Sequence, residues 1–174
     1  LFSRAEHDEL AQPILISSNS QVLKNVQDSI DKLLPSMLRK EIISRSINNR
    51  GIFIKTKNNR EICKIVNDIA PEHLELMSKD YKILLKSIHN AGAIFLGEYS
   101  PEVFGDYCAG PNHVLPTSGS ARFSSPLGVE DFQKRSSLIN VSKKTALELS
   151  KISISMALSE GLQAHALSAK LRGK

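Results

Sequence analysis

The segment GIFIKTKNNREICKIVNDIAPEHLELM, residues 51–77, decides the fold class. Its first six residues, GIFIKT, predict a short apolar strand, and HLELM at its end predicts a second one. Between them, Asn58 or Asn59 can cap a helix whose apolar residues recur at i, i+3, i+4 and i+7, namely Ile62, Ile65, Val66 and Ile69. A strand, a helix and a strand in this order predict parallel strands joined by a crossover helix.

The same alternation continues on both sides of this segment. The further predicted elements are a strand at 13–17, a helix from Ser18 or Ser20 to Pro35, a helix at 79–89 and a strand at 93–97. We therefore predict an α/β domain over residues 1–130, with a partial, doubly wound and mostly parallel sheet. No glycine-rich dinucleotide-binding motif follows any of these strands.

The residues after Phe132 have a different pattern. Lys143 to about Leu158 predict a helix, for which Ser142 is the expected cap. Its apolar residues spread nearly all round, which predicts burial against another element. Gly161 is expected to break this helix before a last one. Residues 131–174 are therefore predicted to form a helical tail appended to the sheet domain.

The composition is that of an ordinary globular protein, with 41% hydrophobic and 24% charged residues. No apolar run approaches the roughly 20 residues that a membrane-spanning helix needs. The two cysteines have no metal-binding spacing, which fits a reducing compartment. We expect a cytoplasmic protein without a membrane partner. Because the chain begins with Leu1 and not with Met, we also expect it to be a piece of something longer, or a processed product.

The net charge of +5 lies in the tail. From Lys134 onward, eight basic residues face two acidic ones, a net charge of +6 that leaves −1 for the preceding part. No aromatic residue follows Phe132, and no nucleic-acid-binding motif is present. The tail therefore predicts a solvated basic helix surface and no nucleic-acid partner.

Glu72 and His73 stand side by side in APEHLEL, at the start of a predicted strand. Imidazole exchanges protons near neutral pH and a carboxylate can orient a water molecule, so the pair suits acid–base catalysis. Open α/β sheets bind ligands at the carboxyl ends of their strands, whereas this pair precedes its strand. A surface ion pair therefore remains an alternative from the residues alone.

Two other histidines also have polar neighbours. His7 lies between Glu6 and Asp8, a grouping that matches no metal signature and also suits a solvated acidic turn. His165 follows Glu160 by five positions, so the two can share a site only through the bend at Gly161. For His165 the alternative is a packing or surface role.

Residues 97–126, GEYSPEVFGDYCAGPNHVLPTSGSARFSSP, predict a long loop, since they have too few regularly spaced apolar residues for a helix or a strand. A loop of this length is usually functional or disordered. Its apolar residues would be expected to seek burial, which disfavours disorder: Tyr99, Phe104, Tyr107, Val114, Leu115 and Phe123. Glu102 and Asp106 are spaced i, i+4, and His113 follows between two prolines. We predict a folded, functional loop.

Four segments together resemble the histidinol dehydrogenase family. They are AEHD (5–8), APEHLEL (70–76), AGAIFLGEYSPEVFGDYCAGPNHVLPTSGSARFSSPLGVEDFQKR (91–135) and SEGLQAHALSAKLR (159–172). The resemblance runs in order along the whole chain and matches the C-terminal portion of the family's length. It implies one half of a Rossmann-like, aldehyde dehydrogenase-like fold.

The resemblance implies a zinc-dependent enzyme of L-histidine biosynthesis. Such an enzyme oxidises L-histidinol through L-histidinaldehyde to L-histidine and passes a hydride to each of two NAD molecules. His73 matches the general base, and Glu72 matches the residue that activates the attacking water. Zinc ligands are matched by His7, Asp106 and His165, and substrate-binding residues by His7, His73, Asp106, His113, Glu160 and His165.

The resemblance also implies a homodimer with shared active sites. The tail would reach the partner subunit, which would supply Glu160 and His165 to the site. The NAD site would lie mainly upstream of Leu1, and for this reason we expect the 174-residue chain alone to have little or no dehydrogenase activity.

Arg4 departs from the family's pattern, in which a glutamine zinc ligand stands three residues before the first histidine ligand. A guanidinium is always charged and has no lone pair to give a metal. We expect Arg4→Gln to tighten zinc binding. Two other functions remain open: a related enzyme for another primary alcohol, and a non-catalytic fragment that only dimerises or complements an N-terminal half.

Overall fold

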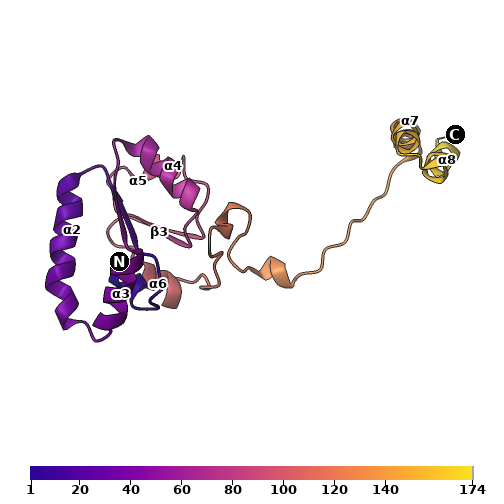
Figure 1. Ribbon diagram of the computed structural model, residues 1–174. Coiled ribbons are helices and arrows are strands. Elements are labelled where there is room, and N and C mark those ends of the chain that lie inside the picture. The colour runs from indigo at the N-terminus through magenta and orange to yellow at the C-terminus, as the bar shows by residue number, and fades with distance from the viewer. Residues whose placement is uncertain (174) are drawn as a thin grey trace. The chain divides into compact units, whose positions relative to one another are not determined.

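The structure is a computed structural model that describes residues 1–173. The chain divides into two compact units, the first over Leu1–Phe132 and the second beginning at Gln133 (Figure 1). None of the helices in residues 1–173 is both long and apolar enough to cross a membrane.

The first unit alternates helices and strands, and its strands pair in parallel (Figure 1). Strand β1 pairs with β2, and β3 pairs with β4, in two two-stranded sheets. The predicted α/β class with parallel strands is confirmed. The elements are α1 (Phe2–Ala5), β1 (Ile14–Ser17), α2 (Ser20–Leu33), η1 (Leu34–Ser36), α3 (Lys40–Arg50), β2 (Ile52–Lys55), α4 (Asn59–Ile69), β3 (His73–Leu76), α5 (Tyr81–Leu85), β4 (Ala93–Leu96), α6 (Glu102–Tyr107), η2 (Ser120–Arg122) and η3 (Val129–Phe132).

Asparagine side chains start the two long helices beside the sheets. The Asn58 Oδ1 accepts a hydrogen bond from the Glu61 backbone N–H, as expected for the cap of α4. Helix α2 is capped by Asn19, whose Oδ1 accepts from the Gln21 N–H, so the expected caps Ser18 and Ser20 were wrong. An amide oxygen of Asn19 reaches the free N–H groups of the first turn, and Ser20 is already helical.

The core of the first unit forms where α4 and α5 pack on one face of the β3–β4 sheet. Its buried members are Cys63, Val66, Leu76, Leu84 and Ile88. Leu74, Ile94 and Leu96 pack against this cluster. Side chains alternate between the two faces of a strand. His73 and Glu75 therefore point to the opposite face, together with their register partners Ala93 and Phe95.

Two predicted features of the first unit differ from the structure, and one of its helices was not predicted. The predicted helix 79–89 is shorter, because α5 ends at Leu85 and the next residues turn back, where the His89 N–H donates to the Asn67 Oδ1. Helix α3 has no sequence prediction. The loop 97–126 contains the helix α6, although its apolar spacing predicted none.

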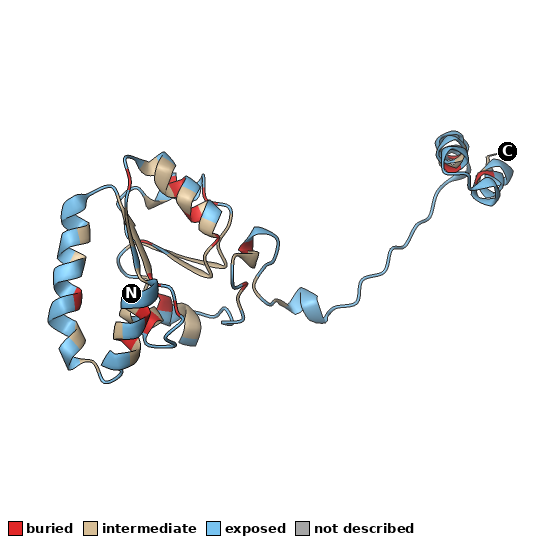
Figure 2. Cartoon of the chain, viewed as in Figure 1, coloured by how far each residue is buried: buried red, intermediate tan, exposed pale blue. Residues whose placement is uncertain are grey.

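The expected burial of the loop's aromatic residues is also wrong for this chain. Tyr99, Tyr107 and Phe123 are each more than four-fifths exposed. Figure 2 shows this part of the chain largely in the exposed colour. The loop is therefore held by local hydrogen bonds and by α6, and its aromatic side chains remain free surface within the described residues.

The second unit is a pair of helices, α7 (Lys143–Ser159) and α8 (Gln163–Arg172). The Ser142 hydroxyl accepts from the Thr145 N–H and caps α7 as predicted. Gly161 has φ 74° and turns the chain between the two helices, a conformation that glycine adopts without strain. Small residues fill the contact of the pair, while most of the apolar side chains of α7 stay exposed (Figure 2).

Candidate functional site

His73 is the first residue of β3, and its side chain is only 9% exposed. Its imidazole stacks on the Phe95 ring, with centroids 6.0 Å apart and an interplanar angle of 28°. Neither ring nitrogen has a hydrogen-bond partner within residues 1–173. Buried polar atoms are normally paired, because an unpaired one costs free energy. A buried imidazole with two unpaired nitrogens therefore indicates a site that binds a ligand or a reacting group.

Two carboxylates from α6 approach the two nitrogens of His73. The Glu102 Oε1 lies 3.6 Å from Nδ1, and the Asp106 Oδ1 lies 3.4 Å from Nε2. The i, i+4 spacing places both carboxylates on one face of the helix. One ligand atom from each of the three residues lies within 4.8 Å of the others. The distances leave the ring between two anions, without a short bond to either.

Helix α6 is fixed against this face of the sheet by two contacts. The Glu102 backbone N–H donates to the Glu75 Oε1 at 2.9 Å, so the side chain of β3 caps the start of α6. Gly105 faces Phe95, and a Cβ at this position would lie 2.6 Å from the ring. A glycine is therefore required for the helix to approach the strand closely enough for Asp106 to meet His73.

A third carboxylate, that of Glu72, lies on the Nδ1 side of the ring. Its Oε1 is 3.9 Å from the His73 Nδ1, and its Oε2 accepts a hydrogen bond from the Arg4 Nη2 at 2.8 Å. Arg4 comes from α1, which packs against α3 and is anchored by the fully buried Ala5. The first turn of the chain thus meets the start of β3 at this site.

The structure brings together Glu72, His73 and Asp106 among the residues expected to form the site. His7 and His113 are exposed, and within residues 1–173 no hydrogen bond or ion pair joins their side chains to this cluster. Glu160, at the C-terminal end of α7, and His165, in α8, are exposed and belong to the second unit.

Glu102 is a member of the cluster that the family resemblance did not single out. Its residue is 8% exposed, which makes it a buried carboxylate. Asp and Glu are almost never fully buried without a partner, so its burial indicates a role. The signal in the sequence was the i, i+4 pair itself, in which Glu102 and Asp106 were equal candidates.

The cluster favours a cation. Glu72, Glu102 and Asp106 each place an oxygen within 3.9 Å of the His73 ring, so like charges gather around a poorly solvated imidazole. Carboxylate and imidazole are also the donors that divalent zinc prefers in enzymes. The arrangement therefore suits a metal ion or a cationic ligand.

The residues present do not fit the four-ligand zinc set that the resemblance implies. The side chain of Arg4 donates to Glu72 and has no lone pair to give a metal. His7 is exposed and lies outside the cluster. Only Asp106 of that set lies within the geometric group formed by His73, Glu102 and Asp106.

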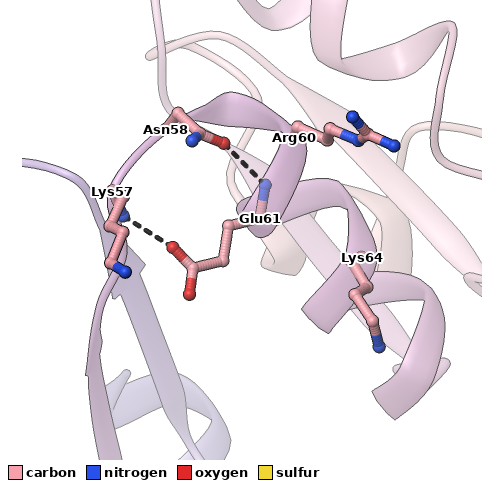
Figure 3. Close-up of a pocket in the computed structure, with 5 residues that line it drawn as sticks. All are labelled: Lys57, Asn58, Arg60, Glu61 and Lys64. Carbon is pink, nitrogen blue, oxygen red and sulfur yellow. Dashed lines mark hydrogen bonds between the residues drawn. The ribbon is translucent and has the colours of Figure 1, made fainter.

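A shallow basic hollow at the start of α4 has a structural explanation (Figure 3). Lys57, Arg60 and Lys64 surround it, next to the free N–H groups of a helix terminus. However, the Glu61 Oε2 accepts from the Lys57 N–H at 2.7 Å, and Asn58 accepts from the Glu61 N–H at 3.0 Å. Asn58 thus caps the helix, and the Glu61 carboxylate binds back to the residue before the cap, in a variant of the capping box that holds this turn from within the chain.

Comparison with known proteins places this chain in a family. The family model described as "Histidinol dehydrogenase" matches residues 1–173. The histidinol dehydrogenase of Dechloromonas aromatica (strain RCB) is 60% identical over 172 residues, which are 99% of this chain and 40% of that protein. The histidinol dehydrogenase of Burkholderia lata is 57% identical over 174 residues, covering 100% of this chain and 40% of that protein.

A solved structure of the same family also matches the fold of this chain. The crystal structure of histidinol dehydrogenase from Elizabethkingia anophelis matches with a TM-score of 0.90 and 32% identity, over 98% of this chain and 39% of that one. The chain therefore spans about two fifths of the length of the relatives it matches. By its sequence and its fold, this chain belongs to the histidinol dehydrogenase family.

Proposed function

We propose that this chain forms the acid–base portion of an NAD-linked histidinol dehydrogenase, which oxidises L-histidinol through L-histidinaldehyde to L-histidine. The observation that carries the proposal is the buried imidazole of His73, with both ring nitrogens unpaired and a carboxylate facing each. Family membership supplies the reaction, and the geometry supplies the base.

His73 is the proposed general base of both oxidations. In the first, the substrate hydroxyl gives its proton to His73 while the carbon gives a hydride to NAD, which leaves the aldehyde. Water then adds to the aldehyde. The hydrate loses a proton to His73 and a hydride to a second NAD, which leaves the carboxylic acid. Glu72, whose Oε1 is next to the ring, is proposed to orient the water for this second oxidation.

The charges of the cluster suit a substrate with cationic groups. Histidinol carries an ammonium group and an imidazole, and carboxylates bind such groups through charge-assisted hydrogen bonds. We assign this role to Asp106 and Glu102, with His113 from the same loop. His7, Glu160 and His165 are further proposed substrate contacts, the last two from the partner of a homodimer. This chain contains no glycine-rich dinucleotide-binding motif. The NAD site is therefore proposed to lie outside it.

The proposal is tested in a chimera in which residues 1–173 replace the matching segment of the Dechloromonas aromatica enzyme. Histidinol-dependent NADH formation is measured, with and without added zinc. His73→Ala should lower kcat by about 100-fold or more, the usual size of a general-base contribution. His89→Ala, an exposed histidine of the same unit, is the matched control and should leave the rate unchanged.

The 174-residue chain assayed alone should show little or no turnover, because the proposed NAD site is absent. Robust NADH formation by the chain alone would contradict that assignment. A chimera that is inactive on histidinol but oxidises another member of a primary-alcohol panel would favour the second candidate, a related alcohol dehydrogenase. The observation that favours this candidate is Arg4, which changes the charge beside the water-orienting carboxylate.

A further inference from the structure

Part of the negative charge of the cluster is offset from within the chain. Glu72, Glu102 and Asp106 gather around His73 with their oxygens 3.4 to 3.9 Å from the ring nitrogens. Gathering carboxylates this close to one another and largely away from water costs free energy, which a nearby cation offsets. Among residues 1–173, Arg4 is the only Lys or Arg residue whose side chain forms an ion pair with one of these carboxylates.

The Arg4–Glu72 pair differs from an ordinary surface ion pair. The two side chains are 35% and 19% exposed, and the Nη2 to Oε2 distance of 2.8 Å is that of a charge-assisted hydrogen bond. The other Arg–Glu pair of this unit, Arg45 with Glu9, is 60% and 50% exposed. Partial burial reduces solvent screening, so the charge of Arg4 acts more strongly on its cluster than that of Arg45 on its surroundings.

We propose that Arg4 is a built-in counter-ion that replaces metal at this site. A guanidinium keeps its charge at every physiological pH, donates to carboxylates and cannot ligate a cation. Held by Glu72, Arg4 stabilises the carboxylates around His73 without zinc, and it removes one ligand from the set that the resemblance implies. The cluster therefore keeps its geometry in the metal-free chain, and zinc binds to it weakly. This inference rests on the proposed function only in taking the cluster as the reaction site.

The same bond makes Arg4 a positioning residue. It occupies the Oε2 of Glu72 and leaves Oε1 facing His73, so the carboxylate is held in one orientation. A glutamine at this position would carry no charge and would offer a carbonyl oxygen. The cluster would then have one positive charge fewer and one more oxygen donor, and both changes favour a divalent cation.

The test is the thermal unfolding of the full 174-residue chain with EDTA and with zinc. The wild-type melting temperature should be the same in both. Arg4→Gln should melt lower than wild type in EDTA and should gain about 5 to 10 °C at a zinc concentration about 100 times its Kd. Arg4→Lys, which keeps the charge and adds no lone pair, should behave as wild type. Arg45→Gln removes the other ion pair and should also remain insensitive to zinc.

A direct measurement accompanies the melting curves. Competition with a chromophoric chelator should give Arg4→Gln at least a tenfold higher zinc affinity than wild type. The proposal is overturned if wild type already binds zinc with submicromolar affinity, if Arg4→Gln shows no gain, or if Arg4→Lys gains as much as Arg4→Gln. If Arg4→Gln does not fold without metal, the wild-type affinity alone decides. None of these readouts needs dehydrogenase activity, so an inactive chimera leaves this inference standing.

Discussion

At His73, the chain buries an imidazole between carboxylates, and no group in residues 1–173 forms a hydrogen bond with either ring nitrogen. Burial of a polar ring in this way opposes stability, and proteins tolerate such strain where function needs it. The ring is held by stacking on Phe95 and by its place at the start of β3, so its position does not depend on a bond to a carboxylate. The nitrogens thus remain free for the proton transfers proposed above.

Removing a charge from this cluster should therefore stabilise the chain. Glu102→Gln keeps the shape of the side chain and relieves the repulsion with Asp106. In the wild-type chain the Glu102 Oε1 lies 3.6 Å from the His73 Nδ1, and an amide N–H in its place could donate toward this nitrogen. We expect the free energy of unfolding to rise by about 1 kcal/mol and the chimera's activity to fall at least tenfold. Chemical denaturation and NADH assays measure the two effects.

The exposed Glu98→Gln is the control for Glu102→Gln, because it removes the same charge from the loop without touching the cluster. It should change neither stability nor activity. Equal effects of the two substitutions on stability would show that net charge, and not the packing of carboxylates around His73, decides the result.

At the scale of elements, the site is made by a strand with two different faces and a short helix laid over one of them. Leu74 and Leu76 face the core beneath α4 and α5, while His73 and Glu75 face α6. The strand therefore joins the hydrophobic core directly to the cluster around His73. Its position in the sheet fixes His73, and α6 supplies two of the three carboxylates.

Gly105→Ala tests this role of α6. The added methyl group would lie 2.6 Å from the Phe95 ring, so the helix has to move away from β4. We expect a loss of about 1 to 3 kcal/mol in unfolding free energy, the usual cost of overpacking, although alanine is the better helix former. Thermal unfolding measures the loss, and a larger distance between Asp106 and His73 should lower the activity of the chimera as well.

The matched variant is Val103→Ala in the same helix, where the side chain is 41% exposed. It should cost little stability. A Gly105→Ala chain as stable and as active as wild type would mean that α6 does not depend on close contact with Phe95.

At the scale of the whole molecule, the first unit has a small core, and one of its two cysteines lies within it. The reactivity of this cysteine therefore measures whether the core is closed. Burial raises the pKa of the Cys63 thiol, and its side chain lies within the core cluster. Cys108 is exposed just after α6. Because the thiolate is the reactive form, both burial and the raised pKa protect Cys63.

A thiol reagent at pH 8 should therefore label one thiol per native chain quickly and the second only on unfolding. Mass spectrometry should place the fast label on Cys108, and Cys108→Ser should abolish it. The slow labelling of Cys63 should accelerate in step with added urea. Rapid labelling of both thiols in the native chain would show that the core of the first unit is open in solution.

The sequence by itself determined the α/β class, the parallel strands and the pair Glu72–His73. Hydrophobic periodicity is local, and it survives in a chain that covers only about two fifths of its relatives. The helix cap at Asn58 and the break at Gly161 followed from residue chemistry in the same way.

Tertiary structure alone decided which charges meet. Helix α6 was missed because its six residues lie mostly at the surface, and its stability comes from Glu75 and Phe95 of neighbouring strands. The pairing of Arg4 with Glu72 joins residues 68 positions apart, and no periodic pattern encodes such a contact. Local sequence thus determined the strands and most of the helices, whereas the grouping of charges around His73 arose only when the fold brought distant side chains within a few ångströms.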